Sequence, residues 1–328
     1  MHHSIRRRAG KRVTLPMGFE PAYIRLYKSG ELHKRVSTAQ ECMRRCNLCA
    51  QYCQADRTRS SEGAVCRTGT LARVHPDPDL KIKEAPLGSA NHAGIIQFSG
   101  CNLRCDYCTD WRVSQTGEGT TVTADELAGL MLDIQARKHS HLHLISPSHV
   151  VAQILQALEI ACAKGLSLPL VYHSGGYDSL EALQLLDGVV DIYAPDIKYG
   201  DNECARIYSH VHNYVEYSHI ALREMYRQVG DLIIDEDGLA RRGILVRHLV
   251  LPENQSSTRK VLAYISADIS PNTYVNLMDS YQPDYQAACH EKLNRALDEA
   301  EIKRALRAGE RCGLHRIELQ MSRPWTNL

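Results

Sequence analysis

Residues 94–108 decide the expected fold, because an apolar strand there runs directly into a loop with three cysteines. The stretch reads Gly94-Ile95-Ile96-Gln97-Phe98-Ser99-Gly100-Cys101-Asn102-Leu103-Arg104-Cys105-Asp106-Tyr107-Cys108. Three thiolates in one tight loop, with no fourth ligand nearby, suit a metal cluster that is held at three corners. We therefore expect a cluster site with one open corner immediately after a buried strand.

From Gly94 onward, short β-branched runs alternate with helical patterns, which predicts βα units and a parallel sheet. The expected strands are 94–98, 142–145, 168–172, 191–194, 244–251 and 273–278. The expected helices are 124–138, 150–164, 179–186, a polar helix from Cys204, 215–229 and 259–269. Thr123 and Glu126 have the spacing of a capping box at the start of the first helix.

Six strands are too few to close a TIM barrel, which needs eight. The count predicts an α/β fold whose core is a partial (β/α)6 TIM-like barrel. The active site of such a barrel lies at the carboxyl ends of the strands, where the cysteine loop is expected.

The chain divides into three expected regions. Residues 1–90 are basic and cysteine-rich, read as mostly loop with a probable auxiliary metal site, and end near the turn-rich segment 75–79. Residues 91–285 form the partial barrel. Residues 286–328 form a C-terminal extension, with a charged helix over 290–308 and a short closing strand near 316–320.

Composition narrows the cellular setting and the partners. The 328 residues carry a net charge of +1 with basic residues spread along the chain, which argues against nucleic acid as a partner. The one basic run, Arg6 to Arg12, is expected to be a solvated tail. We find no membrane-spanning stretch and no signal peptide, so a cytoplasmic protein is expected. Twelve cysteines in that reducing compartment indicate metal binding or catalysis before disulfides.

The cysteine spacing, three residues and then two between a strand and a helix, resembles that of the radical S-adenosylmethionine (SAM) superfamily. Asn102, Leu103, Arg104 and Tyr107 also match that family. The resemblance implies a [4Fe–4S] cluster whose free iron is chelated by SAM. One electron then cleaves SAM to methionine and a 5′-deoxyadenosyl radical, which abstracts hydrogen from a substrate. A zinc knuckle and a chance group of buried thiols are the alternatives.

The resemblance extends over the chain from about residue 40, toward the branch of homologues of pyruvate formate-lyase activating enzyme. The matching segments are 145–149, 173–177, 193–199, 228–231, 247–252 and 274–279. Most of them fall at the carboxyl end of an expected strand, where cofactor and substrate are expected to bind.

Several roles in binding SAM or substrate follow from this resemblance alone. The implied cofactor-binding residues are Ser146, Pro147, Ser148, Ser174, Gly175, Asp196, Lys198, Arg247, Asn276 and Met278. Residues 146–148 replace the family's Gly-Gly-Glu motif and lack its carboxylate, so backbone carbonyls must contact the SAM amino group. Arg247 is the natural partner of the SAM carboxylate, because a guanidinium can bind it through two hydrogen bonds. The alternative for the Ser and Gly residues is that they only form turns at the strand ends. The alternative for Asp196 and Lys198 is a structural salt bridge.

A second set of cysteines lies upstream of the barrel. Cys46, Cys49, Cys53 and Cys66 are four thiols, enough to close either a zinc site or a second [4Fe–4S] cluster. We favour the cluster, because it could pass electrons to or from the active site. Cys42 is a substitute ligand or a buried thiol.

Two features depart from a glycyl-radical activating enzyme. The extra cysteines precede the loop, and 109–123 is too short for a ferredoxin-like insert. Cys204 also departs from the resemblance. It could act as a catalytic residue that returns hydrogen to a substrate radical, as in radical SAM epimerases, or be an ordinary thiol. Cys162 is expected in the core.

The leading hypothesis is a radical SAM enzyme that acts on a small molecule, with a sugar as a fair guess, as an epimerase, a dehydrogenase or another oxidoreductase. Reduced flavodoxin or ferredoxin would be the electron donor. One alternative is an activase that installs a glycyl radical on a protein partner. The other is a non-catalytic iron–sulfur redox or sensor protein.

Overall fold

The computed structural model describes residues 19–77, 79–88 and 93–322. The basic run from Arg6 to Arg12, expected as a solvated tail, lies outside these residues. Over the described ranges, no helix has the length and apolar character needed to cross a membrane.

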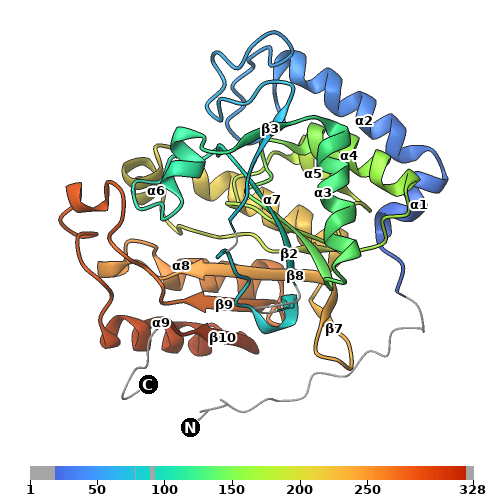
Figure 1. Ribbon diagram of the computed structural model, residues 1–328. Helices are drawn as coiled ribbons and strands as arrows, with labels where there is room; N and C mark the ends of the chain where they lie inside the picture. Colours follow the sequence, from blue (N-terminus) through green and yellow to red (C-terminus); the bar gives the residue numbers. More distant parts are fainter. Residues whose placement is uncertain (1–18, 78, 89–92, 323–328) are drawn as a thin grey trace.

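A single ten-stranded sheet forms the centre of the protein (Figure 1). Its strands are β1 (Ala72–His75), β2 (Ala93–Phe98), β3 (Thr120–Val122), β4 (His141–Ile145), β5 (Leu170–His173), β6 (Ile192–Tyr193), β7 (Ile233–Ile234), β8 (Ala240–Leu249), β9 (Tyr274–Met278) and β10 (Arg316–Gln320). The order is β10-β9-β8-β6-β5-β4-β2-β1-β3, with β7 on β8.

The six strands predicted after Gly94 are all present and lie side by side in parallel. They run β2-β4-β5-β6-β8-β9, and β10 extends the parallel part by one strand. At the other edge, β1 runs antiparallel to both β2 and β3. The sheet is therefore an open, partial barrel in an α/β fold, as the strand count predicted.

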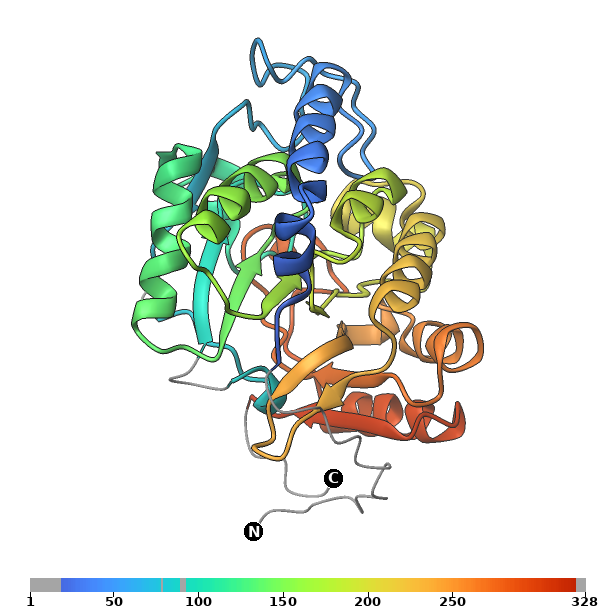
Figure 2. The same ribbon diagram turned by 90° about the vertical axis from the view of Figure 1, so that its right-hand side faces the viewer.

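Helices cover one side of this sheet. They are α1 (Ala22–Lys28), α2 (Glu31–Cys42), α3 (Ala124–Ala136), α4 (Val151–Ala163), α5 (Leu180–Leu186), α6 (Asn202–Ser209), α7 (Tyr214–Val229), α8 (Thr258–Tyr264) and α9 (Glu299–Arg311). Helix α4 packs between α3 and α2, α5 packs on α7, and α8 packs on α9. The blue N-terminal elements lie at one end of the molecule and the orange and red C-terminal elements at the other (Figures 1 and 2).

The two faces of the sheet have different cores. Leu144, Tyr172 and Tyr193 belong to the large apolar cluster that includes the helices. Val171 and Ile192 belong to a smaller cluster on the opposite face, because side chains alternate along a strand. Residues 82–87 supply side chains to this inner cluster and thus cover the inner face of the strands.

Most boundaries agree with the sequence, and the differences have local causes. The capping box predicted at Thr123 is confirmed, with Thr123 N–H donating to Glu126 Oε2 at 2.8 Å and the Glu126 amide donating to Thr123 Oγ1 at 3.2 Å. The helix expected over 290–308 begins only at Glu299, because Asp298 and Glu301 form a second capping box there. The prediction of helix over 290–298 was therefore wrong.

Most of the described residues before 90 are loop, as predicted, but helices α1 and α2 were not predicted. Helix α2 buries Leu32, Val36 and Ala39 and packs on α4, so it is an amphipathic helix whose charged outer face hid its pattern. Strands β1 and β10 come from the two flanking regions, and both join the barrel sheet. The division of the chain at 90 and 285 stays a prediction.

Candidate functional site

The three cysteines of the loop after β2 lie close enough for their thiols to affect one another's pKa. Cys105 is buried, and Cys101 and Cys108 are partly buried. Burial, followed by the neighbouring thiol of Cys105, raises the pKa of Cys101 to about 12 and that of Cys108 to about 11. Thiols this close to one another lose their protons readily only when a metal binds them.

Each of the three sulfur atoms has a hydrogen-bonding partner. The Leu103 amide donates to Cys101 Sγ at 3.4 Å, and the Ser209 hydroxyl donates to Cys105 Sγ at 3.0 Å. Cys108 Sγ lies 3.1 Å from the Ser114 hydroxyl. Hydrogen bonds to the sulfurs are among the features that tune iron–sulfur clusters. Sequence reasoning missed Ser209 and Ser114, because no local pattern pairs them with the loop.

This donor set fits a cluster held at three corners. Burial raises the pKa of Cys105, but the Lys198 ammonium and the Ser209 hydroxyl act in the opposite direction and favour the thiolate. Among the described residues, no three His, Cys, Asp or Glu side chains are arranged to hold one metal ion. A cubane needs no such convergence, because each thiolate binds a different iron.

The cysteine loop lies directly against the upstream cysteine set. Gly100 has φ +83°, and a Cβ atom there would lie 2.7 Å from the Cys66 carbonyl oxygen, so only glycine fits. The Gln51 side chain donates to the Asn102 carbonyl at 2.6 Å. The two cysteine sets, separated in the sequence, are therefore neighbours in the fold.

The upstream set is more deeply buried than the loop. Cys46, Cys49 and Cys66 are buried and Cys53 is partly buried. Burial raises the pKa of Cys49, and the other three thiols add to that shift, so the four are close together. Cys42 is partly buried beside Cys46, which also raises its pKa after the effect of burial.

The ends of β4 and β5 approach the cysteine loop. A Cβ atom on Gly175 would lie 2.8 Å from Leu103, so this strand end touches the loop. Ser146 has φ +56° and donates its amide to the His173 carbonyl at 3.0 Å, while Pro147 continues the same turn.

The hydroxyls of Ser148 and Ser174 lie near the buried carboxylate of Asp178. They favour its charged form, although burial raises the pKa of that group. Ser174 Oγ also accepts from the Gly176 amide at 3.2 Å and so contributes to the turn. Within the described residues, the buried Ser148 Oγ makes no hydrogen bond. The cofactor-binding roles of Ser148 and Ser174 stay predictions.

The ends of β6, β8 and β9 bring five predicted residues into one charged cluster. Lys198 Nζ lies 3.0 Å from Asp196 Oδ2, and Arg247 Nε lies 3.5 Å from Asp196 Oδ1. Arg247 Nη2 points at Met278 Sδ at 3.5 Å. Asn276 is on β9 beside Arg247, to which it is paired in register. Lys198 favours the charged form of Cys101 and Cys105, which indicates that the charged cluster lies beside the cysteine loop.

Glu84 is the member of this cluster that sequence reasoning missed. Its carboxylate lies 2.9 Å from Arg247 Nε and accepts from Asn276 Nδ2 at 3.0 Å. Burial opposes ionisation, yet Arg247 and His173 hold the pKa of Glu84 below its ordinary value. Glu84 is 192 positions from Asn276 in the chain, so no sequence spacing could have identified it.

Two buried histidines extend the cluster toward β4. Burial and the nearby Arg247 lower the pKa of His173 to about 3, so its ring is neutral. Arg247 Nη1 lies 3.4 Å from His173 Nδ1, which must therefore accept. His173 Nε2 then carries the hydrogen and donates to His143 Nδ1 at 2.9 Å. The contacts thus determine the tautomer of both rings.

Cys204 lies on α6, the helix that also carries Ser209. Its Sγ is 3.9 Å from Gln255 Oε1, which accepts a stronger bond from the Tyr208 hydroxyl at 2.8 Å. Burial raises the pKa of the Cys204 thiol. The hydrogen bonds between α6 and the cysteine loop are made by the Ser209 hydroxyl and the Tyr208 carbonyl, and not by Cys204.

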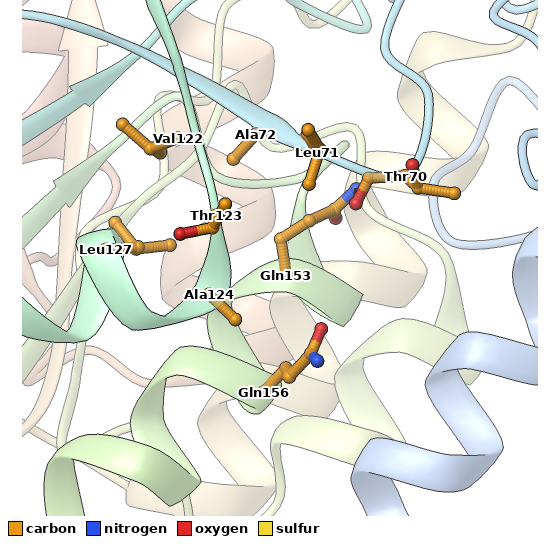
Figure 3. A pocket seen from close by; sticks show the side chains of 9 residues that line it. All are labelled: Thr70, Leu71, Ala72, Val122, Thr123, Ala124, Leu127, Gln153 and Gln156. Carbon is orange, nitrogen blue, oxygen red and sulfur yellow. Dashed lines mark hydrogen bonds between the residues drawn. The ribbon is translucent and has the colours of Figure 1, made fainter.

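Two hollows lie away from the strand ends. A cavity of about 20 Å³ between β1, β3, α3 and α4 is lined by Thr70, Leu127 and Gln153, among others (Figure 3). It has room for about one water molecule. A groove of about 440 Å³ lies along α2 and α5, beside Lys34 and Glu181. Neither hollow includes a residue of the charged cluster.

Comparison with known proteins gives a relative and a set of distant structural similarities. No protein-family model matches the chain. The "Uncharacterized protein MJ0674" of Methanocaldococcus jannaschii is 28% identical over 302 residues, which cover 88% of this chain and 81% of that protein.

Solved structures with a similar arrangement include TYW1 with a lysine–pyruvate adduct bound, methylornithine synthase (PylB), and HydG, a maturase of the [FeFe]-hydrogenase. TYW1 has a TM-score of 0.45 at 16% identity, over 73% of this chain and 79% of its own. The TM-score for PylB is 0.47 at 16% identity, over 91% and 75%. HydG gives 0.48 at 12% identity, over 92% and 66%. TM-scores below 0.5 leave the family of this chain unassigned.

Proposed function

We propose that the protein is a radical SAM enzyme that abstracts hydrogen from a small-molecule substrate. The observation that carries the proposal is the loop at the end of β2, where three neighbouring thiols each have a hydrogen-bonding partner. Bound there, a [4Fe–4S] cluster with SAM would supply one-electron cleavage of SAM and hydrogen-atom abstraction. The chain itself would hold, orient and shield these groups.

The charged cluster beside the loop suits the amino-acid part of SAM. Arg247 Nε is engaged by Glu84. Among the described residues, the hydrogen-bond partners of its two terminal nitrogens are a histidine nitrogen at 3.4 Å and a thioether at 3.5 Å. A carboxylate would be a stronger acceptor for both terminal nitrogens. We assign Arg247 to the SAM carboxylate, and Asp196 and Lys198 to the cofactor or substrate.

The remaining strand ends would complete the SAM site. The turn at Ser146 and Pro147 and the close approach of Gly175 place backbone groups near the loop. Backbone carbonyls would then receive the SAM amino group. Ser174, which also holds the turn through the Gly176 amide, and Ser148, whose hydroxyl makes no hydrogen bond within the described residues, would contribute to the same SAM site.

The upstream cysteines are assigned to a second [4Fe–4S] cluster in preference to zinc, because no three of the described His, Cys, Asp or Glu side chains are arranged to hold a single metal ion. Cys46, Cys49, Cys53 and Cys66 provide a full set of four ligands, which leaves no open position for substrate. The close approach of the Cys66 carbonyl to Gly100 supports a position for this site next to the first. A cluster there would be close enough to exchange electrons with the SAM site.

The net reaction proposed is an epimerisation or dehydrogenation of a small molecule, with a saccharide as the first class to test. Reduced flavodoxin or ferredoxin would supply the electron. Cys204 is proposed as the donor that returns hydrogen to a substrate radical. Cys204→Ala would then leave SAM cleavage intact and abolish product, whereas unchanged turnover would remove this role.

The test is anaerobic reconstitution followed by measurement of 5′-deoxyadenosine from SAM under reducing conditions. We expect 5′-deoxyadenosine to form, and deuterium from a labelled substrate to enter it. A protein that binds iron and sulfide but forms none would be a non-catalytic redox or sensor protein. A glycyl radical seen by EPR on an added protein partner would point instead to an activase.

A further inference from the structure

Arg57 is a buried guanidinium at the centre of the upstream cysteine set. Only 1% of the residue is exposed. Its Nε donates to the Thr68 carbonyl at 2.7 Å, its Nη2 to the Gly69 carbonyl at 3.4 Å, and its Nη1 to Cys46 Sγ at 3.5 Å. Thr68 and Gly69 lie two and three residues after Cys66, so Arg57 links Cys46, the first cysteine of the set, to the segment that follows Cys66, the last.

No carboxylate balances this charge. In the part of the chain that the structure describes, the partly buried Arg247 has ion pairs with Glu84 and Asp196, whereas Arg57 has no ion pair with an Asp or Glu. An arginine cannot lose its proton in a protein, and a buried charge without a counter-charge is strongly unfavourable. The two carbonyls supply dipoles but no negative charge.

Metal-bound thiolates would supply the missing counter-charge. Four neutral thiols carry none, whereas four thiolates around Zn²⁺ or a [4Fe–4S]²⁺ core leave a net charge of about −2. The Cys46 sulfur that accepts from Arg57 would then be an anion, and hydrogen bonds to charged acceptors are the stronger ones. The unbalanced guanidinium is thus explained if the site is loaded.

We propose that Arg57 is the positioning residue that stabilises a metal–thiolate site at Cys46, Cys49, Cys53 and Cys66, by donating to Cys46 Sγ and balancing the negative charge of the site. This inference rests on the second metal site proposed above. It is independent of whether the first site cleaves SAM.

The position of Arg57 also ties the second site to the first. Through the carbonyls of Thr68 and Gly69, it fixes the chain that follows Cys66, and the Cys66 carbonyl lies against Gly100. The Gln153 side chain on α4 donates to the same Gly69 carbonyl at 2.9 Å. Loss of metal from the second site would therefore make the segment after Cys66, which packs against Gly100 and the Cys101 loop, more mobile.

The test counts metal that resists a chelator in the reconstituted holoprotein, with Cys101, Cys105 and Cys108 changed to Ala so that only the second site contributes. In this background we compare Arg57→Gln, which removes the charge, with Arg57→Lys, which keeps it. Arg35→Gln is the matched control, because Arg35 on α2 also donates to two backbone carbonyls, those of Leu185 and Asp187, but pairs with a carboxylate, Glu31.

We expect Arg57→Gln to weaken metal retention about 10- to 100-fold, as is usual when a residue that supports a metal ligand is lost. Arg57→Lys should retain an intermediate amount, and Arg35→Gln should match the parent. If the bound group is a cluster, its reduction potential should fall in Arg57→Gln. Equal retention in all three variants would overturn the proposal, as would a parent protein that binds no metal at these four cysteines.

A merely structural role for Arg57 predicts a different result. It would lower the thermal stability of the metal-free and the metal-loaded protein by the same amount. Our proposal requires a larger loss in the loaded protein, because the metal–thiolate charge exists only there. Equal losses in both forms would contradict it, whether or not the intact protein cleaves SAM.

Discussion

The two cysteine sets lie side by side but are built differently. The loop after β2 has three thiols at the carboxyl end of a parallel strand, with Ser209, Ser114 and Lys198 as their polar neighbours. The upstream set has four thiols off the sheet, with the single buried guanidinium of Arg57. A set of three ligands beside charged strand ends leaves room for a substrate or cofactor and is typical of a catalytic site. A complete, buried set of four ligands is typical of a site for electron transfer or structural stability.

The largest expected effect is the loss of SAM cleavage when a cysteine of the loop set, but not one of the upstream set, is replaced. Cys105→Ala should abolish the formation of 5′-deoxyadenosine, because only the loop set would bind SAM. Cys49→Ala should remove metal from the second site and leave measurable SAM cleavage. Assays of iron, sulfide and 5′-deoxyadenosine on both variants test this difference. Cys162→Ala on α4 is the control and should behave as the parent. Equal activity in the Cys105 and Cys49 variants would erase the distinction.

The next effect concerns the charge at the loop. Lys198→Gln removes the ammonium that favours the Cys105 thiolate and leaves Asp196 with Arg247 alone. We expect SAM cleavage to fall about 10- to 100-fold, while the metal content of the upstream set stays the same. Lys260→Gln is a suitable control, since Lys260 makes a similar ion pair with Asp201 at 2.9 Å but is exposed. If Lys198→Gln lost metal from both cysteine sets, Lys198 would not act on the loop set alone, and the prediction would be wrong.

A smaller effect should appear at the junction of the two sets. His149 is 1% exposed and donates from Nε2 to the Ser99 carbonyl at 2.9 Å. Burial and the nearby Arg57 lower its pKa to about 4. Between pH 6.5 and 4 the unfolded chain takes up a proton that the native protein does not, so stability falls as the pH is lowered.

The expected loss from His149 alone is about 1.4 kcal/mol per pH unit in that window. Urea unfolding at several pH values between 7 and 4.5 measures it. His149→Gln should show a shallower dependence on pH, because other buried histidines such as His248 continue to contribute. An unchanged slope would mean that His149 does not resist protonation in the fold.

The smallest expected effect tests the hydrogen bond between the sets. Gln51→Leu removes the donor to the Asn102 carbonyl and should cost about 1 kcal/mol of unfolding free energy. It should also shift the EPR signal of the loop cluster, because Asn102 follows Cys101. Gln135→Leu removes a similar bond, to the Gly165 carbonyl at 3.0 Å, far from both sets. A shift of the signal in the Gln135 variant as well would show that the effect is not local.

The comparison also shows which parts of the site could be predicted. The strands, most helices and the capping box at Thr123 follow local patterns of apolar and capping residues, and the structure has them nearly in place. Amphipathic helix α2 escaped notice because its charged face dominates its composition. The clustering of Asp196, Lys198, Arg247, Asn276 and Met278 followed from a general rule, that parallel strands end at the same edge.

The partners of these groups were not predictable. Ser209 lies 104 positions from Cys105, and Glu84 lies 192 positions from Asn276. Arg57 is close to the cysteines in the chain, but the sequence does not show that its guanidinium is buried or that no described Asp or Glu pairs with it.

The sequence by itself determined the order of strands and helices, the two cysteine sets and the strand ends where charged residues gather, because these depend on spacing along a few neighbouring residues. Only the tertiary structure decided that the two cysteine sets touch and that Glu84 engages Arg247. It also decided that Arg57 is buried beside the cysteines with no Asp or Glu partner among the described residues. Contacts between distant segments, and the burial that makes a charge costly, exist only once the chain has folded.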